Sequence, residues 1–207
     1  MVAIIDYDAG NIRSVENAMT MLGKETVLTR DPGVIRRADH VILPGVGSFG
    51  DAMDRIRRYG LEEVIREVVQ SDTPFLGICL GLQLLFEESE ESPGVKGLSV
   101  LRGKIRRIPA GTEPETGTLR KIPQIGWNNL AFPRQGRLFR DIEEGAYVYF
   151  VHSYYLQAES KEIVTATTQY GVTVEASVER NNVFACQFHP EKSAEVGLQI
   201  LTNFLQV

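Results

Sequence analysis

The segment Pro74–Cys79 is almost continuously apolar, and it constrains the fold more than any other part of this chain. A strand that is apolar on both faces must be covered on both, as at the centre of a parallel sheet between helices. Leu80–Glu88 follows at once with helical spacing of its apolar residues. This order of strand, glycine-flanked turn and helix predicts an α/β fold.

The rest of the first half repeats the alternation of short strands and helices, which is typical of a mostly parallel sheet. The spacing predicts strands over Val2–Asp6, Glu25–Thr29 and His40–Leu43, a helix over Asn11–Leu22, and a helical stretch from Asp51 to about Gln70 that breaks near Tyr59-Gly60.

The second half, from about Gly97, is rich in β-type segments. We therefore expect one domain, residues 1–207, with a mostly parallel central sheet flanked by helices and a β-rich second half. The polar segment Gly111–Lys121 indicates an exposed loop, and an apolar stripe of Ala194, Leu198, Leu201 and Leu205 predicts a closing helix. Strands are expected at Lys104–Ile108, Tyr147–Val151, Ile163–Thr168, Thr173–Val178 and Val183–Phe188.

Composition excludes several classes of function. A chain of 207 residues with 43% hydrophobic residues can bury a core without disulfides or metals. Its net charge of −5 disfavours nucleic-acid binding, which usually needs a basic surplus. No apolar run approaches the ~18 residues of a membrane span, and no signal-peptide pattern opens the chain. The presence of only two cysteines favours a reducing, cytoplasmic setting. The His and Cys residues lack the spacing of metal ligands. No nucleotide-binding fingerprint indicates a cofactor.

Cys79 lies between Gly77 and Gly81 where a strand should turn into a helix. In a nucleophile elbow such a turn strains the backbone of the nucleophile, and flanking glycines remove side chains that would clash. A buried cysteine in a tight turn is an equally good interpretation of this pentapeptide.

The segment His189-Pro190-Glu191 favours the interpretation of Cys79 as a nucleophile. A nucleophilic thiol needs a base, and the base needs a group that orients it. Residues two apart in an extended chain point to the same side, so Glu191 can reach the His189 ring, and Pro190 disfavours helix there. Together with Cys79, this pair predicts a catalytic triad.

These residues resemble a known family. The segment from Gly77 to Gln83 and the His189-Pro190-Glu191 segment are similar to the class I (triad) glutamine amidotransferases, and the resemblance covers essentially the whole chain. Within that family, Asp6-Tyr7 with Gly10-Asn11, Pro44–Gly50, Gly126-Trp127-Asn128 and His152-Ser153-Tyr154 most resemble the glutaminase subunits of imidazole glycerol phosphate synthases. Asp8 stands where those subunits usually have glycine, and we expect a local adjustment there without loss of function.

The resemblance implies a mechanism. Cys79 would attack the side-chain amide of L-glutamine, His189 would move the proton, and Glu191 would hold the His189 tautomer. The oxyanion would be met by the Leu80 N–H and by a backbone N–H from the Pro44–Gly47 segment, that is from Gly45, Val46 or Gly47. We expect this segment to rest with its donor misdirected until a partner binds.

The resemblance also implies binding roles and a partner. Gln83, Ser153 and Tyr154 would hold the α-amino and α-carboxylate groups of glutamine, without any cofactor or metal. The partner would be a cyclase subunit with a (β/α)₈ barrel that accepts ammonia for histidine biosynthesis. Asn11, Trp127, His152 and Lys192 would lie at that interface.

Three alternatives remain open at this stage. The subunit could serve another acceptor, as in anthranilate, GMP or pyridoxal phosphate synthesis. The chain could be a catalytically silent binding module on the same fold, although intact Cys79, His189 and Glu191 argue against this. A standalone thiol hydrolase would show robust glutamine turnover without a partner.

Overall fold

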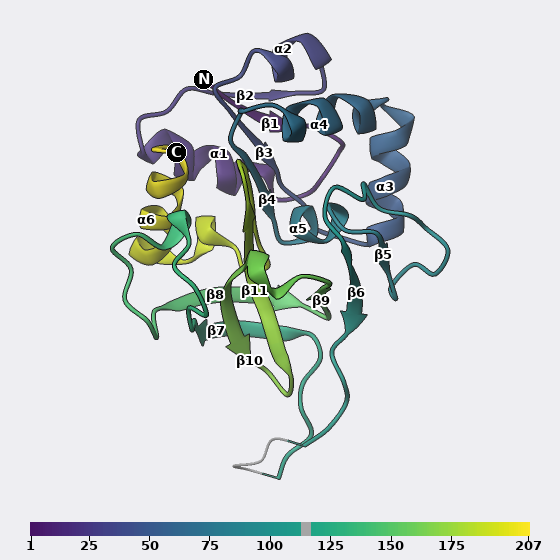
Figure 1. Ribbon diagram of the computed structural model, residues 1–207, viewed down its shortest axis with the longest axis vertical. Coiled ribbons are helices and arrows are strands. Elements are labelled where there is room, and N and C mark those ends of the chain that lie inside the picture. The colour runs from purple at the N-terminus through teal and green to yellow at the C-terminus, as the bar shows by residue number, and fades with distance from the viewer. Residues whose placement is uncertain (113–116) are drawn as a thin grey trace.

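A seven-stranded sheet forms the centre of the computed structural model, which describes residues 1–112 and 117–207 (Figure 1). Its order is β10-β11-β12-β4-β3-β1-β2. The pairs within β12-β4-β3-β1-β2 are parallel, and β10-β11-β12 are antiparallel. The expected α/β class with a mostly parallel sheet and a β-rich second half is confirmed. The sheet strands are β1 (Val2–Ile5), β2 (Thr26–Thr29), β3 (His40–Leu43), β4 (Phe75–Ile78), β10 (Val164–Gln169), β11 (Thr173–Arg180) and β12 (Val183–Cys186).

Helices flank this sheet, with α1 and α6 on one side and α3, α4 and α5 on the other in Figure 1. Local signals set their ends: the Ser48 hydroxyl accepts from the Asp51 N–H at the start of α3, and Gly60 takes a left-handed conformation between α3 and α4. The helices are α1 (Ile12–Met21), α2 (Pro32–Arg36), α3 (Phe49–Arg58), α4 (Leu61–Gln70), α5 (Leu80–Leu84) and α6 (Ala194–Phe204), with 3₁₀ turns at Arg137–Phe139, Lys161–Ile163 and Pro190–Lys192.

Two small sheets lie beyond the end of the large one. One has the order β5-β6-β9, and the other pairs β7 with β8. Along β8, Val148, Phe150 and His152 are buried while the alternate residues face outward, which is the pattern of a half-buried strand. The strands are β5 (Glu88–Ser89), β6 (Gly103–Arg107), β7 (Gln124–Asn129), β8 (Tyr147–His152) and β9 (Tyr154–Ala158).

The parallel strands bring distant segments to one edge. Their carboxyl ends lead into the Asp6–Asn11, Pro44–Gly47 and Cys79–Leu80 segments, and β12 leads to His189. The strand order reverses between β1 and β3, and such switch points at the carboxyl edge of α/β sheets are where ligands bind. The topology therefore locates a candidate site at this edge.

Several expectations about single elements were wrong. The helix expected over Leu80–Glu88 ends at Leu84, because the Leu84 carbonyl accepts from Leu98 N–H at 2.8 Å instead of continuing the helix. The segment Gly126-Trp127-Asn128 has the glycine and asparagine content typical of a loop, but it lies in β7, because pairing with β8 satisfies its backbone.

The apolar stripe expected on the closing helix was right in part, because Leu201 is buried and Leu198 and Leu205 are partly buried against the core. Ala194 is exposed, and the buried apolar face of α6 consists of Gly197, Ile200, Leu201 and Phe204. Strand β12 ends at Cys186, before the expected end at Phe188.

The expected loop Gly111–Lys121 lies in part outside the described residues, at 113–116; beside that gap, Thr112 and Leu119 form an antiparallel bridge. None of the helices in the described ranges is long and apolar enough to cross a membrane.

Candidate active site

Cys79 has the strained backbone of a nucleophile elbow. Its φ of 55° and ψ of −107° lie in a region that L-residues rarely adopt. A Cβ on Gly81 would lie 1.9 Å from the Leu43 carbonyl oxygen, and one on Gly77 would lie 2.8 Å from the Gly81 oxygen. The two glycines therefore allow β3, β4 and α5 to approach closely enough to expose the thiol at the strand end.

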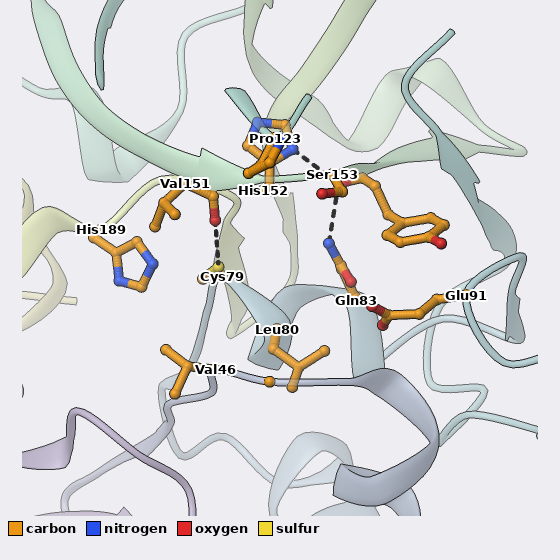
Figure 2. Close-up of a pocket in the computed structure, with 12 residues that line it drawn as sticks. Val46, Cys79, Leu80, Gln83, Glu91, Pro123, Val151, His152, Ser153 and His189 are labelled. Carbon is orange, nitrogen blue, oxygen red and sulfur yellow. Dashed lines mark hydrogen bonds between the residues drawn. The ribbon is translucent and has the colours of Figure 1, made fainter. Parts of the chain in front are cut away.

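The thiol lies at the floor of a cavity of ≈270 Å³, between His189 and Gln83 in Figure 2. Its Sγ is 3.9 Å from the Val151 carbonyl oxygen, and the Gln187 side-chain amide donates to it at 3.6 Å. Figure 2 shows one ring nitrogen of His189 turned toward Cys79. This leaves the sulfur accessible from the cavity and flanked by polar groups.

His189 and Glu191 form a buried pair. Nδ1 of His189 is 2.7 Å from Oε1 of Glu191, and the two side chains are 2% and 1% exposed. Nε2 of His189 has no hydrogen-bond partner in the described residues, so it is placed to exchange a proton with Cys79 or with a bound molecule. Nucleophile, base and orienting acid thus stand in the order that triad chemistry requires.

The backbone conformation between His189 and Glu191 differs from the extended one expected. His189 is extended, but Pro190–Lys192 forms a 3₁₀ turn, with Pro190 at its first position. The argument from alternation along an extended chain was therefore wrong, although the two side chains do meet. Proline favours the start of a helical turn because its fixed φ suits that position and its missing N–H is not needed there.

Electrostatics favour a charged His189. Burial alone lowers the pKa of His189, but its interactions with Cys79 and Glu191 raise it to about 10. An imidazolium beside the sulfur is the charge that a nucleophilic thiolate needs. His152 behaves oppositely, because burial lowers its pKa to about 4.

The expected oxyanion donor of Leu80 is already engaged. The Leu80 N–H donates to the Gly45 carbonyl oxygen at 3.4 Å, so a carbonyl from the Pro44–Gly47 segment faces this donor. The same peptide plane carries the Val46 N–H on its other side. Rotation of the Gly45-Val46 peptide would replace the carbonyl by an N–H at this place. The Tyr7 hydroxyl donates to the Pro44 carbonyl at 2.7 Å and fixes the segment just before that peptide.

The remaining predicted binding residues line the same cavity. These lining residues are Val46, Gly47, Leu80, Gln83, Ser153 and Tyr154. In Figure 2, Val46 and Leu80 lie on one side of the cavity and Ser153 on the other, with Gln83 between them. The Gln83 amide nitrogen donates to the Tyr154 carbonyl at 3.1 Å and to Gln187 Oε1 at 3.0 Å. Gly45 lies beneath the cavity, where a Cβ would come within 2.8 Å of the Leu80 Cβ.

Sequence reasoning missed two residues of this site. Glu91 lines the cavity and accepts from the Phe49 N–H at 2.7 Å, which also caps the start of α3. Gln187 contacts the thiol and is fully buried. Its position two residues before His189 was a usable signal, since residues two apart in an extended segment face the same side. The acidic run at 87–91 contained no comparable signal for Glu91.

The four residues expected at a partner interface differ in exposure. Trp127 is 52% exposed on β7, where it meets Tyr149 edge-on at 6.2 Å, and Lys192 is also exposed. Asn11 is half-buried and donates to Glu191 Oε1 at 3.2 Å. His152 is buried, with Nδ1 2.8 Å from the Tyr154 oxygen and Nε2 3.0 Å from Gln124 Oε1.

Asp8 adopts a left-handed conformation, with φ of 60°, at the position where the similar subunits usually have glycine. The cost is offset locally, because its carboxylate pairs with Arg30 at 2.8 Å and accepts from the Tyr59 hydroxyl. These hydrogen bonds, first from Tyr59 and then from Arg30, lower the pKa of Asp8. The loop that carries Asn11 is therefore held by a charged cluster where glycine would have left it open.

In the described part of the chain, no group of three or more His, Cys, Asp or Glu residues is placed to hold a metal ion. The site is built from a thiol, an imidazole, carboxylates and amides.

Comparisons with known proteins agree with this chemistry. A family model described as class-I glutamine amidotransferase matches residues 3–207. The chain is 51% identical over 203 residues to the imidazole glycerol phosphate synthase subunit HisH of Moorella thermoacetica, covering 98% of this chain and 93% of that one. The subunit of the same name from Syntrophotalea carbinolica is 48% identical over 204 residues, covering 99% and 98%.

Solved structures show the same fold at lower identity. A crystal structure of a glutamine amidotransferase matches with a TM-score of 0.74 at 21% identity, covering 100% of this chain and 98% of that one. The crystal structure of another glutamine amidotransferase, from Thermotoga maritima, matches with a TM-score of 0.65 at 17% identity, covering 99% and 82%.

Proposed function

The chain belongs to the class-I glutamine amidotransferase family, and we propose that Cys79, His189 and Glu191 are the triad with which it hydrolyses L-glutamine. It is the glutaminase subunit of an imidazole glycerol phosphate synthase and acts in histidine biosynthesis, as its similarity over essentially the full length of the HisH subunits supports. The observation that carries the mechanism is the strained Cys79 facing the buried His189–Glu191 pair.

In this mechanism the Cys79 thiolate attacks the amide carbon of the glutamine side chain. His189 donates its proton to the leaving nitrogen, ammonia departs, and a γ-glutamyl thioester remains. His189 then accepts a proton from water, which attacks the thioester and releases glutamate and the thiolate. Glu191 holds Nδ1 of His189 at 2.7 Å throughout, so that Nε2 carries the transferred proton. General acid–base steps of this kind contribute about 10²–10⁴-fold in rate.

The cavity offers matching groups for the polar end of glutamine. The Glu91 carboxylate has the charge to bind an α-ammonium group, and Gln83 with the Ser153-Tyr154 backbone offers hydrogen bonds nearby. A volume of ≈270 Å³ suits an amino acid with an extended side chain. We assign these residues to glutamine recognition and Cys79 to the reacting end.

The Pro44–Gly47 segment acts as a gate. In the arrangement described above the Gly45 carbonyl takes the Leu80 N–H, so that donor cannot stabilise an oxyanion. Rotation of the Gly45-Val46 peptide frees Leu80 and presents the Val46 N–H. One oxyanion donor is worth about 10²–10³ in rate, so the unrotated peptide suffices to silence the free protein.

The partner is a cyclase subunit with a (β/α)₈ barrel, to which the released ammonia passes. The outward face of the β7–β8 ribbon suits such a docking partner: Ile125 and Trp127 are 63% and 52% exposed, and both pair across the ribbon with residues next to the cavity, Val151 and Tyr149. Exposed Lys192 and half-buried Asn11 border Glu191 on the same edge of the sheet. His152, which is buried, would contribute to this interface by holding Tyr154.

We also propose a cytoplasmic location and action as a single domain, residues 1–207. A nucleophilic thiol must stay reduced, and both cysteines are free. The site takes Asn11 from one end of the chain and Glu191 from the other, so neither half could act alone.

Ammonia and glutamate release from glutamine tests this function. The purified chain should release little of either alone and much more with the cyclase and its nucleotide ligand. Absence of release under both conditions would favour a silent binding module. High release without a partner would favour a standalone hydrolase. If release is stimulated only by a subunit for anthranilate, GMP or pyridoxal phosphate synthesis, the acceptor assignment is wrong.

A further inference from the structure

Gln187 is held beside the nucleophile by the register of the sheet. Strands β12 and β4 are parallel with Cys186 opposite Ile78, and the Cys79 N–H donates to the Cys186 carbonyl at 2.7 Å. Gln187, the residue that follows the end of β12, therefore lies next to Cys79. The Gln187 backbone N–H is bound in turn to the Ala176 carbonyl of β11 at 2.8 Å. The backbone at Gln187 is therefore held by hydrogen bonds on both sides, next to Cys79 and next to β11.

The amide of Gln187 is oriented by a chain of hydrogen bonds. The Tyr154 carbonyl can only accept, so Gln83 must present its NH₂ group there, at 3.1 Å. The same NH₂ group donates to Oε1 of Gln187 at 3.0 Å. The NH₂ group of Gln187 is thereby left for Cys79, with Nε2 at 3.6 Å from Sγ. The Tyr154 carbonyl thus fixes the orientation of both side-chain amides, so that the Cys79 sulfur faces an N–H donor.

This orientation favours the reactive form of the thiol. Gln187 is fully buried, and a hydrogen bond to a charged group in such surroundings is stronger than one in water. A thiol is a weak acceptor, whereas a thiolate gains from each donor aimed at it. A donor from the sheet side also leaves the cavity side of the sulfur free to attack.

We propose that Gln187 is a further catalytic residue, a buried donor that stabilises the Cys79 thiolate and is held in orientation by Gln83 and the Tyr154 carbonyl. The proposal rests on Cys79 being the nucleophile of the proposed function. It also ties the glutamine-binding side of the cavity to the nucleophile, since Gln83 takes part in both.

The test is alkylation of Cys79 by iodoacetamide across a pH series, which needs neither glutamine nor partner. A Cys186→Ala background leaves Cys79 as the single thiol, since the chain has two cysteines. Gln187→Met keeps the length of the side chain but removes the donor, and should slow alkylation about tenfold at pH values below the midpoint of the wild-type profile. A tenfold change in thiolate fraction displaces the pH profile upward by about one unit.

Gln187→Glu separates this role from packing. It has the same shape as glutamine but places a carboxylate oxygen near the sulfur, so alkylation should be slower still than in Gln187→Met. A residue that only fills space would give the opposite order, with Glu closest to the wild type. Glutamine turnover with the cyclase should follow the same order, with kcat falling more than KM rises.

Ser177→Ala is the matched control, because it removes a fully buried hydrogen bond to the Ala185 carbonyl on the neighbouring strand without touching the thiol. Its alkylation profile should equal that of the wild type. Thermal unfolding checks that each variant is folded, and Gln187→Glu carries the test if Gln187→Met does not fold. Equal profiles for wild type, Met and Glu variants would overturn the role of Gln187. Normal alkylation together with no glutamine turnover would overturn the proposed function instead.

Discussion

Lowering the pH from 7 to 5 should destabilise this protein by about 2 kcal/mol through a single side chain, His152. Its ring is buried, with both nitrogens in contact with Tyr154 and Gln124. Burial lowers the pKa of His152 to about 4, against a value of ~6.5 for an unfolded chain. Between these values the unfolded state binds a proton that the folded state does not, so stability falls as the pH falls through the window from 6.5 to 4.

The magnitude follows from the two pKa values. At pH 7 both states are almost uncharged at His152, and the penalty is small. At pH 5 the unfolded imidazole is nearly fully protonated and the folded one is not. Since pH 5 lies about 1.5 units below the unfolded pKa and each unit is worth about 1.36 kcal/mol, the loss of stability is about 2 kcal/mol. For a chain of this length 2 kcal/mol corresponds to about 4–8 °C in Tm.

The assay compares wild type with His152→Asn by thermal and urea unfolding at pH 7 and pH 5. Asparagine keeps an N–H for the Tyr154 carbonyl but does not titrate in this range. The variant should be less stable at pH 7, and the gap to the wild type should shrink by about 2 kcal/mol at pH 5. Other titrating groups cancel in this difference because both chains carry them.

NMR of the imidazole resonances provides a direct reading, since the chain has three histidines. His152 should titrate near pH 4 and His189 near pH 10. A His152 midpoint at or above 6, or an unfolding gap that is the same at pH 7 and pH 5, would refute the reasoning from burial.

Three further predictions concern the triad and the gate. Cys79→Ala should abolish glutamine hydrolysis, while its complex with the cyclase should still form product from added ammonium salts; residual glutaminase above a few per cent of wild type would exclude Cys79 as the nucleophile. Glu191→Gln should reduce kcat less than His189→Asn does, because an orienting group matters less than the base; steady-state rates with the partner decide this, and equal losses would contradict the division of roles. Val46→Pro removes the N–H that the peptide rotation would present and should lower partner-stimulated turnover about 10²–10³-fold, whereas Val46→Gly keeps that N–H and should remain activatable; full stimulation of Val46→Pro would rule out this gate.

Local patterns in the sequence predicted much of the fold. The continuous apolar run of β4 predicted a central parallel strand, and the glycines around Cys79 predicted a sharp turn, because both depend on residues adjacent in the chain. The boundaries of β3 and α4 also agree closely with expectation, since apolar spacing and Gly60 define them locally.

Elements that depend on distant hydrogen bonds were predicted poorly. Helix α5 ends at Leu84 because residues more than ten positions later take its carbonyls. Strand β7 has the glycine and asparagine content of a loop, and only its pairing with β8 makes it a strand. Local propensity is too weak to oppose such pairing, so the outcome depends on which segments meet in space.

In the candidate site, too, local sequence patterns indicate some residues, whereas the contacts of others depend on the tertiary structure. The proposed triad of Cys79, His189 and Glu191 could be selected from the sequence, because a nucleophile elbow and a closely spaced histidine and acid are chemically distinctive. The contacts of Glu91, Gln187 and Asn11 could not be predicted from it, since they join residues that are 42, 108 and 180 positions apart in the chain. Local sequence determines which side chains can react, whereas the register of the parallel strands decides which of them touch, because a shift of one residue would turn each side chain to the other face of the sheet.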